Sequence, residues 1–464
     1  MGQMGQLNLD SVKKVYFIGI GGSSMSSLAE ILKLRGYEVC GSDMQQSHTV
    51  EHLEKMGIGV TVGQKAENIA NFQPEVVIKT DAIMSNNPEL IYAEQHHIPV
   101  YRRALLLGVL LDEYPMTVGV AGTHGKTTTT SMITSIFLTA GKDPSAIIGG
   151  HMKQIDSSYR IGKSDLCIFE SCEFKESFLH FHPNISVILN IAQDHMEYFK
   201  TVENLIHSFQ TYLKNARPGG AVIANAEDEN SLQMLSGYSG KVVTFGLEKG
   251  DFTAANIQIS HGLTSFDILY QNQFFCSVGL SVPGRHNIKN ALAAAAAAYT
   301  AGLSASEIGQ GLHAYTGAQR RFEYHCKING AIVADDYGHH PDAYRVTFQT
   351  ARDMGFKRII AIHQPHTYSR TKMMMDEFVA VLKTVDHVLI PPIYAARETN
   401  DLYHVCSQDL VDRLPNAEFV PDFEHIADRI KQMAQPGDLF ITLGCGDIYK
   451  AAELTAKKYG EEIF

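Results

Sequence analysis

The residue types best suited to chemistry gather in one glycine-rich stretch that begins at residue 122. Residues 116–121 form a short apolar run, which predicts a buried strand, and the residues after 126 follow a helical pattern. In such a strand–loop–helix unit, glycines let backbone N–H groups turn toward phosphates, and the helix N-terminus adds partial positive charge. Lys126 can reach the terminal phosphates of a nucleotide, and the hydroxyl of Thr127 can hold Mg²⁺. The candidate nucleotide-binding residues of this loop are Gly122, Thr123, His124, Gly125, Lys126, Thr127 and Thr128.

The spacing of this loop differs from the standard Walker motif, because Val120 stands where that motif has its first glycine. The alternative is a glycine-rich turn with a solvated lysine. The Lys-Thr pair between a strand and a helix favours nucleotide binding.

A second glycine-rich turn, at residues 19–24, follows an apolar run at residues 13–18 and precedes a helical pattern. A second predicted strand leads to Asp43. This order is typical of the opening of a Rossmann unit, in which a pyrophosphate meets the glycines and an acid meets a ribose. Ser24 replaces the third glycine of the fingerprint, so a tight turn without a ligand stays open as an alternative. The candidate residues are Gly19, Ile20, Gly21, Gly22, Ser23, Ser24 and Asp43.

Acidic and histidine side chains follow two further predicted strands, at residues 165–170 and 185–190. Glu170 ends the first strand and Glu173 follows it, and Asp194 and His195 come after the second. Ligands of parallel α/β sheets bind outside the carboxyl ends of the strands, so these residues are expected near the Lys126 loop. They suit a magnesium-bound nucleotide, for which the metal-ligand candidates are Thr127, Glu170 and His195. The alternatives are a solvated strand end and, for His195, a helix cap.

The C-terminal third again alternates predicted strands with polar ends. Residues 335–341 and 363–370 follow two of these strands, and they include His339 and Arg370. The histidines in these stretches, together with Tyr337, could form a zinc site, although they lack a clear ligand triad. Asn290, just before an alanine-rich helix predicted at residues 291–299, could bind an adenine edge or cap the helix.

Composition limits the protein class. The chain has 464 residues, of which 45% are hydrophobic and 19% charged, which is enough for about three domains. The net charge of −11 argues against a nucleic-acid binder. No apolar run is long enough to span a membrane, no signal peptide is expected, and seven scattered cysteines fit a reducing cytoplasm. We expect an α/β fold with domains at residues 1–112, 113–316 and 317–464.

The motifs together resemble those of the Mur ligases, over nearly the whole chain. The resemblance rests on residues 19–25, 122–128, 194–196, 283–287, 320–322, 335–341 and 364–370. It implies three domains: an N-terminal Rossmann-like domain for a UDP-sugar, a central P-loop-type ATPase sheet, and a C-terminal Rossmann-like domain that brings an amino acid.

The resemblance also implies a reaction. ATP would phosphorylate the lactyl carboxylate of UDP-N-acetylmuramate, and the amine of L-alanine would attack the acyl phosphate to form an amide in peptidoglycan precursor synthesis. ATP and Mg²⁺ would be the cofactors, and the chain would be a monomer or a weak homodimer. Three alternatives stay open: a recycling ligase that adds a tripeptide, a non-catalytic nucleotide sensor, and an oxidoreductase based on residues 19–24 alone.

Residue roles follow from the resemblance. Lys126 would stabilise the γ-phosphate, Thr127 and Glu170 would hold one Mg²⁺, and His195 would help to hold a second. The remaining implied contacts are Asn290 and Arg321 with adenine and phosphates, Asp336 with ribose, residues 19–24 with the UDP diphosphate, Asp43 with uridine, His124 with the muramoyl group, and His339 and Arg370 with the amino acid.

The chain departs from the family pattern at three of its polar stretches. Cys172 and Lys175 replace acidic residues of the central stretch. Thr367 stands where many relatives have an arginine, and residues 79–81 are larger and more polar than usual. No counterpart of the carbamylated lysine of several sister ligases is expected after His195.

Overall fold

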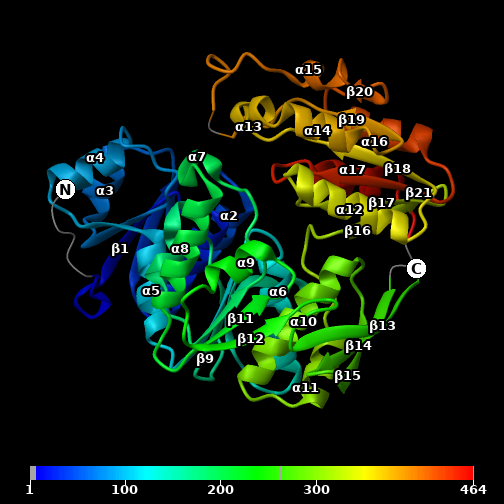
Figure 1. Ribbon diagram of the computed structural model, residues 1–464. Helices are drawn as coiled ribbons and strands as arrows, with labels where there is room; N and C mark the ends of the chain where they lie inside the picture. Colours follow the sequence, from blue (N-terminus) through cyan, green and yellow to red (C-terminus); the bar gives the residue numbers. More distant parts are fainter. Residues whose placement is uncertain (1–6, 261–262, 397, 463–464) are drawn as a thin grey trace. The chain divides into compact units, whose positions relative to one another are not determined.

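The computed structural model describes residues 7–260, 263–396 and 398–462, and in these ranges strands and helices alternate (Figure 1). The chain divides into two compact units. The first comprises the described residues up to Thr253 together with Tyr270–Asn272 and Leu292–Gly311. The second comprises Ala254–Leu269, Gln273–Ala291 and the described residues from Leu312 onward. No helix in the described ranges is long and apolar enough to cross a bilayer.

The N-terminal part of the first unit is a five-stranded parallel sheet in the order β3-β2-β1-β4-β5. The strand order reverses beside β1, which makes the carboxyl end of β1 a topological switch point where such sheets bind ligands. The elements of this part are β1 (Lys14–Ile18), α1 (Ser23–Leu34), β2 (Glu38–Asp43), α2 (His48–Lys55), β3 (Gly59–Val62), α3 (Ala66–Phe72), β4 (Val76–Lys79), α4 (Pro88–Gln95), β5 (Val100–Arg102) and α5 (Arg103–Asp112).

The second sheet has ten strands in the order β15-β14-β13-β12-β11-β10-β6-β9-β7-β8. Its strands are β6 (Met116–Ala121), β7 (Ser145–Met152), β8 (Ser157–Arg160), β9 (Leu166–Glu170), β10 (Ile185–Ile188), β11 (Ala221–Asn225), β12 (Lys241–Phe245), β13 (Phe252–Ser260), β14 (Leu263–Tyr270) and β15 (Gln273–Leu280). Its longer helices are α6 (Lys126–Thr139), α8 (Val202–Lys214), α10 (Arg285–Thr300) and α11 (Ala305–His313). Strand β6 pairs in parallel with β9 and β10, so the three ends that carry the polar motifs are neighbours.

Helix α6 is buried along nearly its whole length although its first half is rich in threonine. Helix α11 packs closely against it, because a Cβ atom on Gly311 would come within 2.3 Å of the Cα atom of Ile136. The hydroxyl of Ser135 donates to the carbonyl oxygen of Gly311 at 2.9 Å. This packing fixes the helix whose N-terminus carries Lys126.

The third sheet lies in the second unit and has the order β16-β17-β21-β18-β19-β20. Only the β16–β17 pair is antiparallel among the pairings of this sheet in the described ranges. Alternate residues of β18 enter two different cores, with Ile359 and Ala361 in one and Ile360 and Ile362 in the other, so helices cover both faces. The elements are β16 (Glu323–Ile328), β17 (Ala331–Asp336), α12 (Pro341–Asp353), β18 (Arg358–His363), α13 (Tyr368–Met373), α14 (Met375–Leu382), β19 (His387–Ile390), α15 (Ser407–Val411), β20 (Ala417–Phe419), α16 (Phe423–Met433), β21 (Asp438–Leu443) and α17 (Tyr449–Tyr459).

The α/β class with parallel sheets is confirmed, whereas several local expectations are wrong. The helix expected from residue 291 begins at Arg285, because Gly284, at φ 99°, turns the chain and the polar residues after it continue into the helix. The carboxylates of Asp335 and Asp336 belong to the last residues of β17 and do not follow it. The three domain boundaries stay a prediction.

Candidate active site

The Lys126 loop begins directly after β6 and ends at the first turn of α6. Gly122 has φ 133° and Gly125 has φ 89°, conformations that side chains rarely adopt, so both glycines are needed. A Cβ atom on Gly122 would also lie 3.0 Å from the carbonyl oxygen of Asn190. Gly125 is the N-cap of α6, and no side chain caps this helix. The first N–H groups of α6 therefore suit an anion such as a phosphate.

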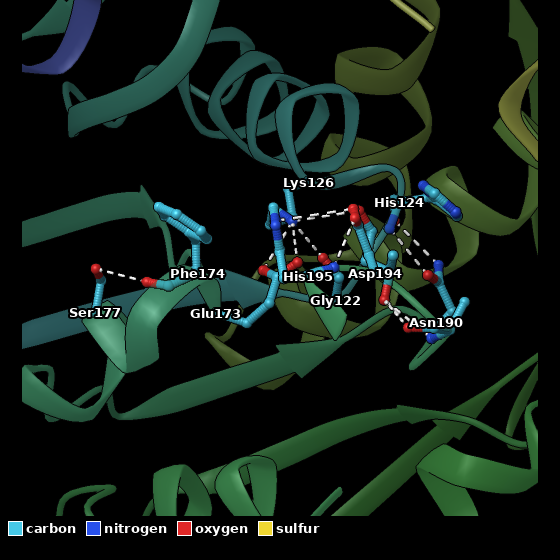
Figure 2. A network of polar contacts seen from close by, with 11 residues as sticks. Gly122, His124, Lys126, Glu173, Phe174, Ser177, Asn190, Asp194 and His195 are labelled. Atoms are coloured by element: carbon cyan, nitrogen blue, oxygen red, sulfur yellow. Dashed lines mark hydrogen bonds and ion pairs between the residues drawn. The ribbon is translucent and has the colours of Figure 1, made fainter. Parts of the chain in front are cut away.

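Asn190, at the end of β10, holds the loop in shape (Figure 2). Its side-chain oxygen accepts from the His124 N–H at 2.9 Å, and its amide nitrogen donates to the His124 carbonyl oxygen at 3.0 Å. Its own carbonyl oxygen accepts from the Thr123 N–H at 3.0 Å. The sequence analysis assigned Asn190 no role. The only sequence signal for one was its position as the last residue of the strand predicted at residues 185–190. The loop is thus preformed by a neighbouring strand end.

Lys126 forms a buried ion pair with Glu173. Its Nζ atom lies 2.9 and 3.1 Å from the two carboxylate oxygens and also donates to the carbonyl oxygens of Gly122 and Thr123. Only 16% of the Lys126 side chain and 3% of the Glu173 side chain are exposed. Burial by itself lowers the pKa of Lys126, but Glu173, with smaller contributions from Cys172 and Glu170, offsets this effect, so the pKa is raised and the ammonium group stays charged.

Two of the three expected metal ligands meet at strand β7. The Glu170 carboxylate accepts from the Gly149 N–H at 2.7 Å. A Cβ atom on Gly150 would lie 3.2 Å from Thr127 Cγ2, so Thr127 is beside the same strand. No group of three or more His, Cys, Asp or Glu side chains in the described ranges forms a metal site. A hydroxyl and one carboxylate nevertheless fit Mg²⁺, which usually takes one or two protein ligands and completes its shell with phosphates and water.

His195 lies beside Phe174 and Asp194. Its ring centroid is 4.6 Å from that of Phe174, the residue after Glu173, and its Nε2 atom is 3.8 Å from an oxygen of Asp194 (Figure 2). His195 precedes the short helix α7 (Met196–Phe199) in a left-handed conformation, with φ 56°, and its side chain does not cap that helix. The alternative of a helix cap is thus confirmed for the position of His195, which is the N-cap residue of α7, although the cap uses only its backbone.

The N-terminal glycine turn has the geometry of a second anion site. The Gly19 and Ile20 N–H groups donate to the Ser42 carbonyl oxygen at 2.8 and 2.9 Å, and α1 begins without a side-chain cap. The Asp43 carboxylate accepts from the Gly21 N–H at 2.9 Å, so this acid stabilises the turn itself. The Ile20 side chain is fully buried in the core and is available only through its backbone.

A polar junction connects the N-terminal sheet to the central stretch after β9. The Arg102 guanidinium binds both Asp81 carboxylate oxygens, at 2.7 and 3.0 Å, and donates to the Lys175 carbonyl oxygen at 3.1 Å. The Lys175 ammonium group donates in turn to the Asp81 carbonyl oxygen at 3.1 Å. The departure at Lys175 thus stabilises a contact with residues 79–81, which also depart from the family pattern.

The expected adenosine contacts lie in the second unit. The Asn290 amide donates to the Asn287 side chain at 3.1 Å inside α10, so Asn290 does not cap that helix. Arg321 stacks on the Tyr337 ring at 5.2 Å, and its charge opposes the effect of burial, which raises the pKa of Asp336. Asp336 accepts from the Phe322 and Gly338 N–H groups at 3.0 and 2.8 Å.

His286, in the first turn of α10, lies one helical turn before Asn290, and the residue is exposed. The structure therefore brings Arg321 and Asp336 together, and Asn290 belongs to the same unit, whereas the Lys126 loop belongs to the other unit.

The expected amino-acid contacts lie around α13. Thr367, the N-cap of this helix, accepts from the Arg370 N–H at 3.3 Å, so its hydroxyl orients the turn that carries Arg370. Burial and the Arg370 charge lower the pKa of His366 to about 4. The rings of His339 and His366 are 6.4 Å apart. The zinc hypothesis for these histidines finds no group of ligands in the described ranges.

Comparisons with known proteins identify the family of this chain. Three family models match: the Mur ligase family, catalytic domain, at residues 14–115; the Mur ligase middle domain, at residues 120–298; and the Mur ligase, glutamate ligase domain, at residues 320–446. A UDP-N-acetylmuramate–L-alanine ligase from Acetivibrio thermocellus is 43% identical to this chain, covering 98% of each. A ligase of the same name from Agathobacter rectalis is 42% identical, covering 96% of this chain and 98% of its own length.

A solved structure gives the same answer. The UDP-N-acetylmuramate–alanine ligase MurC from Thermotoga maritima superposes with a TM-score of 0.82 at 28% identity, covering 96% of this chain and 98% of its own. The family models together match well over half of the residues, and the relatives match nearly the full length. The chain belongs to the Mur ligase family.

Proposed function

We propose that this protein joins L-alanine to the lactyl carboxylate of UDP-N-acetylmuramate with ATP as the energy source, in peptidoglycan precursor synthesis. The observation that carries the proposal is the buried, charged Lys126 at the uncapped start of α6. A cation and a row of free N–H groups at one point suit the γ-phosphate of a nucleotide. The relatives that match this chain over nearly its full length carry the name of this ligase.

The first step is phosphoryl transfer. A lactyl carboxylate oxygen attacks the γ-phosphorus of ATP, the bond to the β-phosphate oxygen breaks, and ADP leaves. Such a step depends on positioning and charge neutralisation. Lys126 and the N–H groups of residues 122–128 bind the phosphates. Thr127 and Glu170 would hold one magnesium ion, and His195 would help to hold a second near the substrate carboxylate. Magnesium, when bound, would neutralise charge on the transferring phosphoryl group.

The second step is acyl transfer. The L-alanine amine attacks the acyl carbon, a tetrahedral species collapses, and phosphate leaves with the former carboxylate oxygen. Arg370 and His339 are the residues we assign to the amino acid. Asn290, Arg321 and Asp336 are assigned to adenosine and its phosphates, the turn at residues 19–24 and Asp43 to the UDP end, and His124 to the muramoyl group.

We place this reaction in the cytoplasm, where ATP and nucleotide sugars are available. The seven cysteines are free thiols, in keeping with a reducing compartment. A monomer or a weak homodimer stays our expectation for the oligomeric state.

A matrix of substrates tests the proposal. Phosphate release is measured with Mg²⁺, ATP and UDP-N-acetylmuramate, and L-alanine, glycine, L-serine or the tripeptide is added in turn. We expect turnover that requires both the UDP-sugar and L-alanine, with an amide product confirmed by mass spectrometry. Turnover only with the tripeptide would assign the chain to recycling, and ATP binding without any turnover would refute catalysis.

A further inference from the structure

Arg103, the first residue of α5, is a cation without a protein partner in the described part of the chain. Its neighbour Arg102 is fully engaged with Asp81 and the Lys175 carbonyl oxygen, whereas no hydrogen bond or ion pair joins the Arg103 side chain to any described residue. Its surroundings are partly buried, and this burial lowers its pKa. Arginine nevertheless keeps its charge in proteins, so an unsatisfied cation sits in a poorly hydrated place.

The neighbouring contacts define where Arg103 lies. On one side, Arg102 ties the start of α5 to the turn at residues 79–81. A Cβ atom on Gly19 would be only 3.2 Å from Thr80 Cγ2, so that turn adjoins the first glycine turn. On the other side, Arg102 contacts Lys175, at the end of the central stretch 172–175.

The central stretch adjoins the second glycine loop. Glu173 pairs with Lys126 there, and Cys172, the residue before Glu173, and Asp81 are the two neighbouring groups that oppose the effect of burial on the pKa of Arg103. Helix α5 packs closely against the residues that follow the central stretch. A Cβ atom on Gly108 would lie 2.3 Å from the His180 carbonyl oxygen. Arg103 is therefore held between the two glycine loops of the first unit.

A UDP-sugar that reacts with ATP must bridge these two loops. Its diphosphate suits the turn at residues 19–24, and its carboxylate must approach the γ-phosphate beside Lys126. Two anions then come together, while Lys126 already shares its charge with Glu173. The carboxylate needs a cation of its own, and a guanidinium group binds a carboxylate with two parallel hydrogen bonds.

We propose that Arg103 binds the lactyl carboxylate of the UDP-sugar and thereby selects the muramoyl substrate over UDP-sugars that lack this group. The inference rests on the proposed function, because it assumes that UDP-N-acetylmuramate is the substrate. It assigns Cys172 a role as well: a thiol at this position leaves the Arg103 charge available, whereas the acidic residue of the family pattern would compete with the substrate carboxylate for it.

Calorimetric titration of the full chain, with Mg²⁺ and a non-hydrolysable ATP analogue present, tests the inference. The two probes are UDP-N-acetylmuramate and UDP-N-acetylglucosamine, which lacks the lactyl group. We expect Arg103→Met to weaken binding of the first probe by about 10- to 100-fold, the range of a charge-assisted hydrogen-bonded pair, and to leave binding of the second unchanged. Arg103→Lys should recover part of the loss, because it restores the charge without the two-point geometry.

Arg102→Met is the matched control. It removes the neighbouring arginine, which stabilises the junction between the N-terminal sheet and the stretch after β9. It should therefore weaken the binding of both probes by the same factor. An equal loss of both probes in Arg103→Met would assign the residue to the diphosphate or to the junction and overturn the inference, as would an unchanged preference. A wild-type chain that binds neither UDP-sugar would instead refute the proposed function. The thermal midpoint and binding of the ATP analogue report whether each variant is folded.

Discussion

The Lys126–Glu173 pair allows catalysis and stability to be separated by one double-mutant cycle. Lys126→Met removes the ammonium group and leaves Glu173, only 3% exposed, without its partner. Breaking a buried pair from one side costs about 3 kcal/mol or more. For a domain of about 150–250 residues, such as the predicted central domain, that cost lowers Tm by roughly 6 to 12 °C.

The second substitution should restore stability but not activity. In Lys126→Met/Glu173→Gln no charge is left buried, so most of the lost stability should return. Loss of the phosphate-binding cation should lower kcat/KM by at least about 10³-fold in both variants, because one stabilising donor at a reacting centre contributes about that much. Phosphate release and differential scanning calorimetry measure the two quantities.

Two results would refute this reasoning. A double variant as unstable as Lys126→Met would mean that Glu173 is not an uncompensated buried charge in the single variant. Normal turnover of Lys126→Met would remove this lysine from the phosphate site. Unchanged binding of the UDP-sugar in both variants is the control that the N-terminal turn is intact.

Three further predictions concern the other parts of the site. Gly149→Ala should raise the Mg²⁺ concentration needed for half-maximal turnover several-fold, with little change in Tm. The new Cβ atom would lie 2.4 Å from a Glu170 carboxylate oxygen and would displace that flexible side chain. An unchanged Mg²⁺ titration would exclude Glu170 as a ligand. Arg370→Ala should raise the KM for L-alanine by about 10-fold or more and the KM for ATP far less, as expected for a lost charge-assisted contact, and the reverse order would place Arg370 elsewhere. His363→Gln should flatten the loss of Tm between pH 7 and pH 5, whereas the exposed His207→Gln should leave that profile unchanged.

The sign of the pH effect follows from burial. His363 is 1% exposed and its pKa is lowered to about 3 from the ordinary value of 6.5, so only the unfolded chain takes up the proton as the pH falls below about 6.5. Stability is therefore lost between about pH 6.5 and pH 3, and this one group accounts for about 2 kcal/mol between pH 7 and pH 5. Equal pH slopes in the wild type and His363→Gln would contradict the buried, neutral imidazole.

Local signals in the sequence predicted the elements that carry the phosphate loop. The apolar run of β6 and the glycines before Lys126 are short-range features, and the structure has strand, loop and helix where expected. Long-range partners had no such signal. Glu173 meets Lys126 from 47 positions away, and Asn190 meets His124 from 66 positions away. Neither contact could be read from composition or periodicity, because each depends on which strand ends become neighbours.

Strand β7 is an element that the sequence pattern did not predict. Its sequence, SAIIGGHM, has two glycines in its middle and no regular alternation, so it did not read as a strand. Those glycines are what allow the Glu170 carboxylate and Thr127 to approach the strand. The start of α10 was missed because most residues from Arg285 to Asn290 are polar and do not form an apolar helical pattern.

An isotope experiment tests the central claim, transfer of the γ-phosphoryl group to the lactyl carboxylate followed by amide formation with L-alanine. UDP-N-acetylmuramate carrying ¹⁸O in both carboxylate oxygens is turned over with Mg²⁺, unlabelled ATP and L-alanine, and the phosphate is analysed by mass spectrometry. We predict one ¹⁸O atom in each phosphate and the other in the new amide, because the attacking oxygen stays on phosphorus when the amine displaces it. Unlabelled phosphate, or labelled phosphate without an L-alanine amide, would contradict the account.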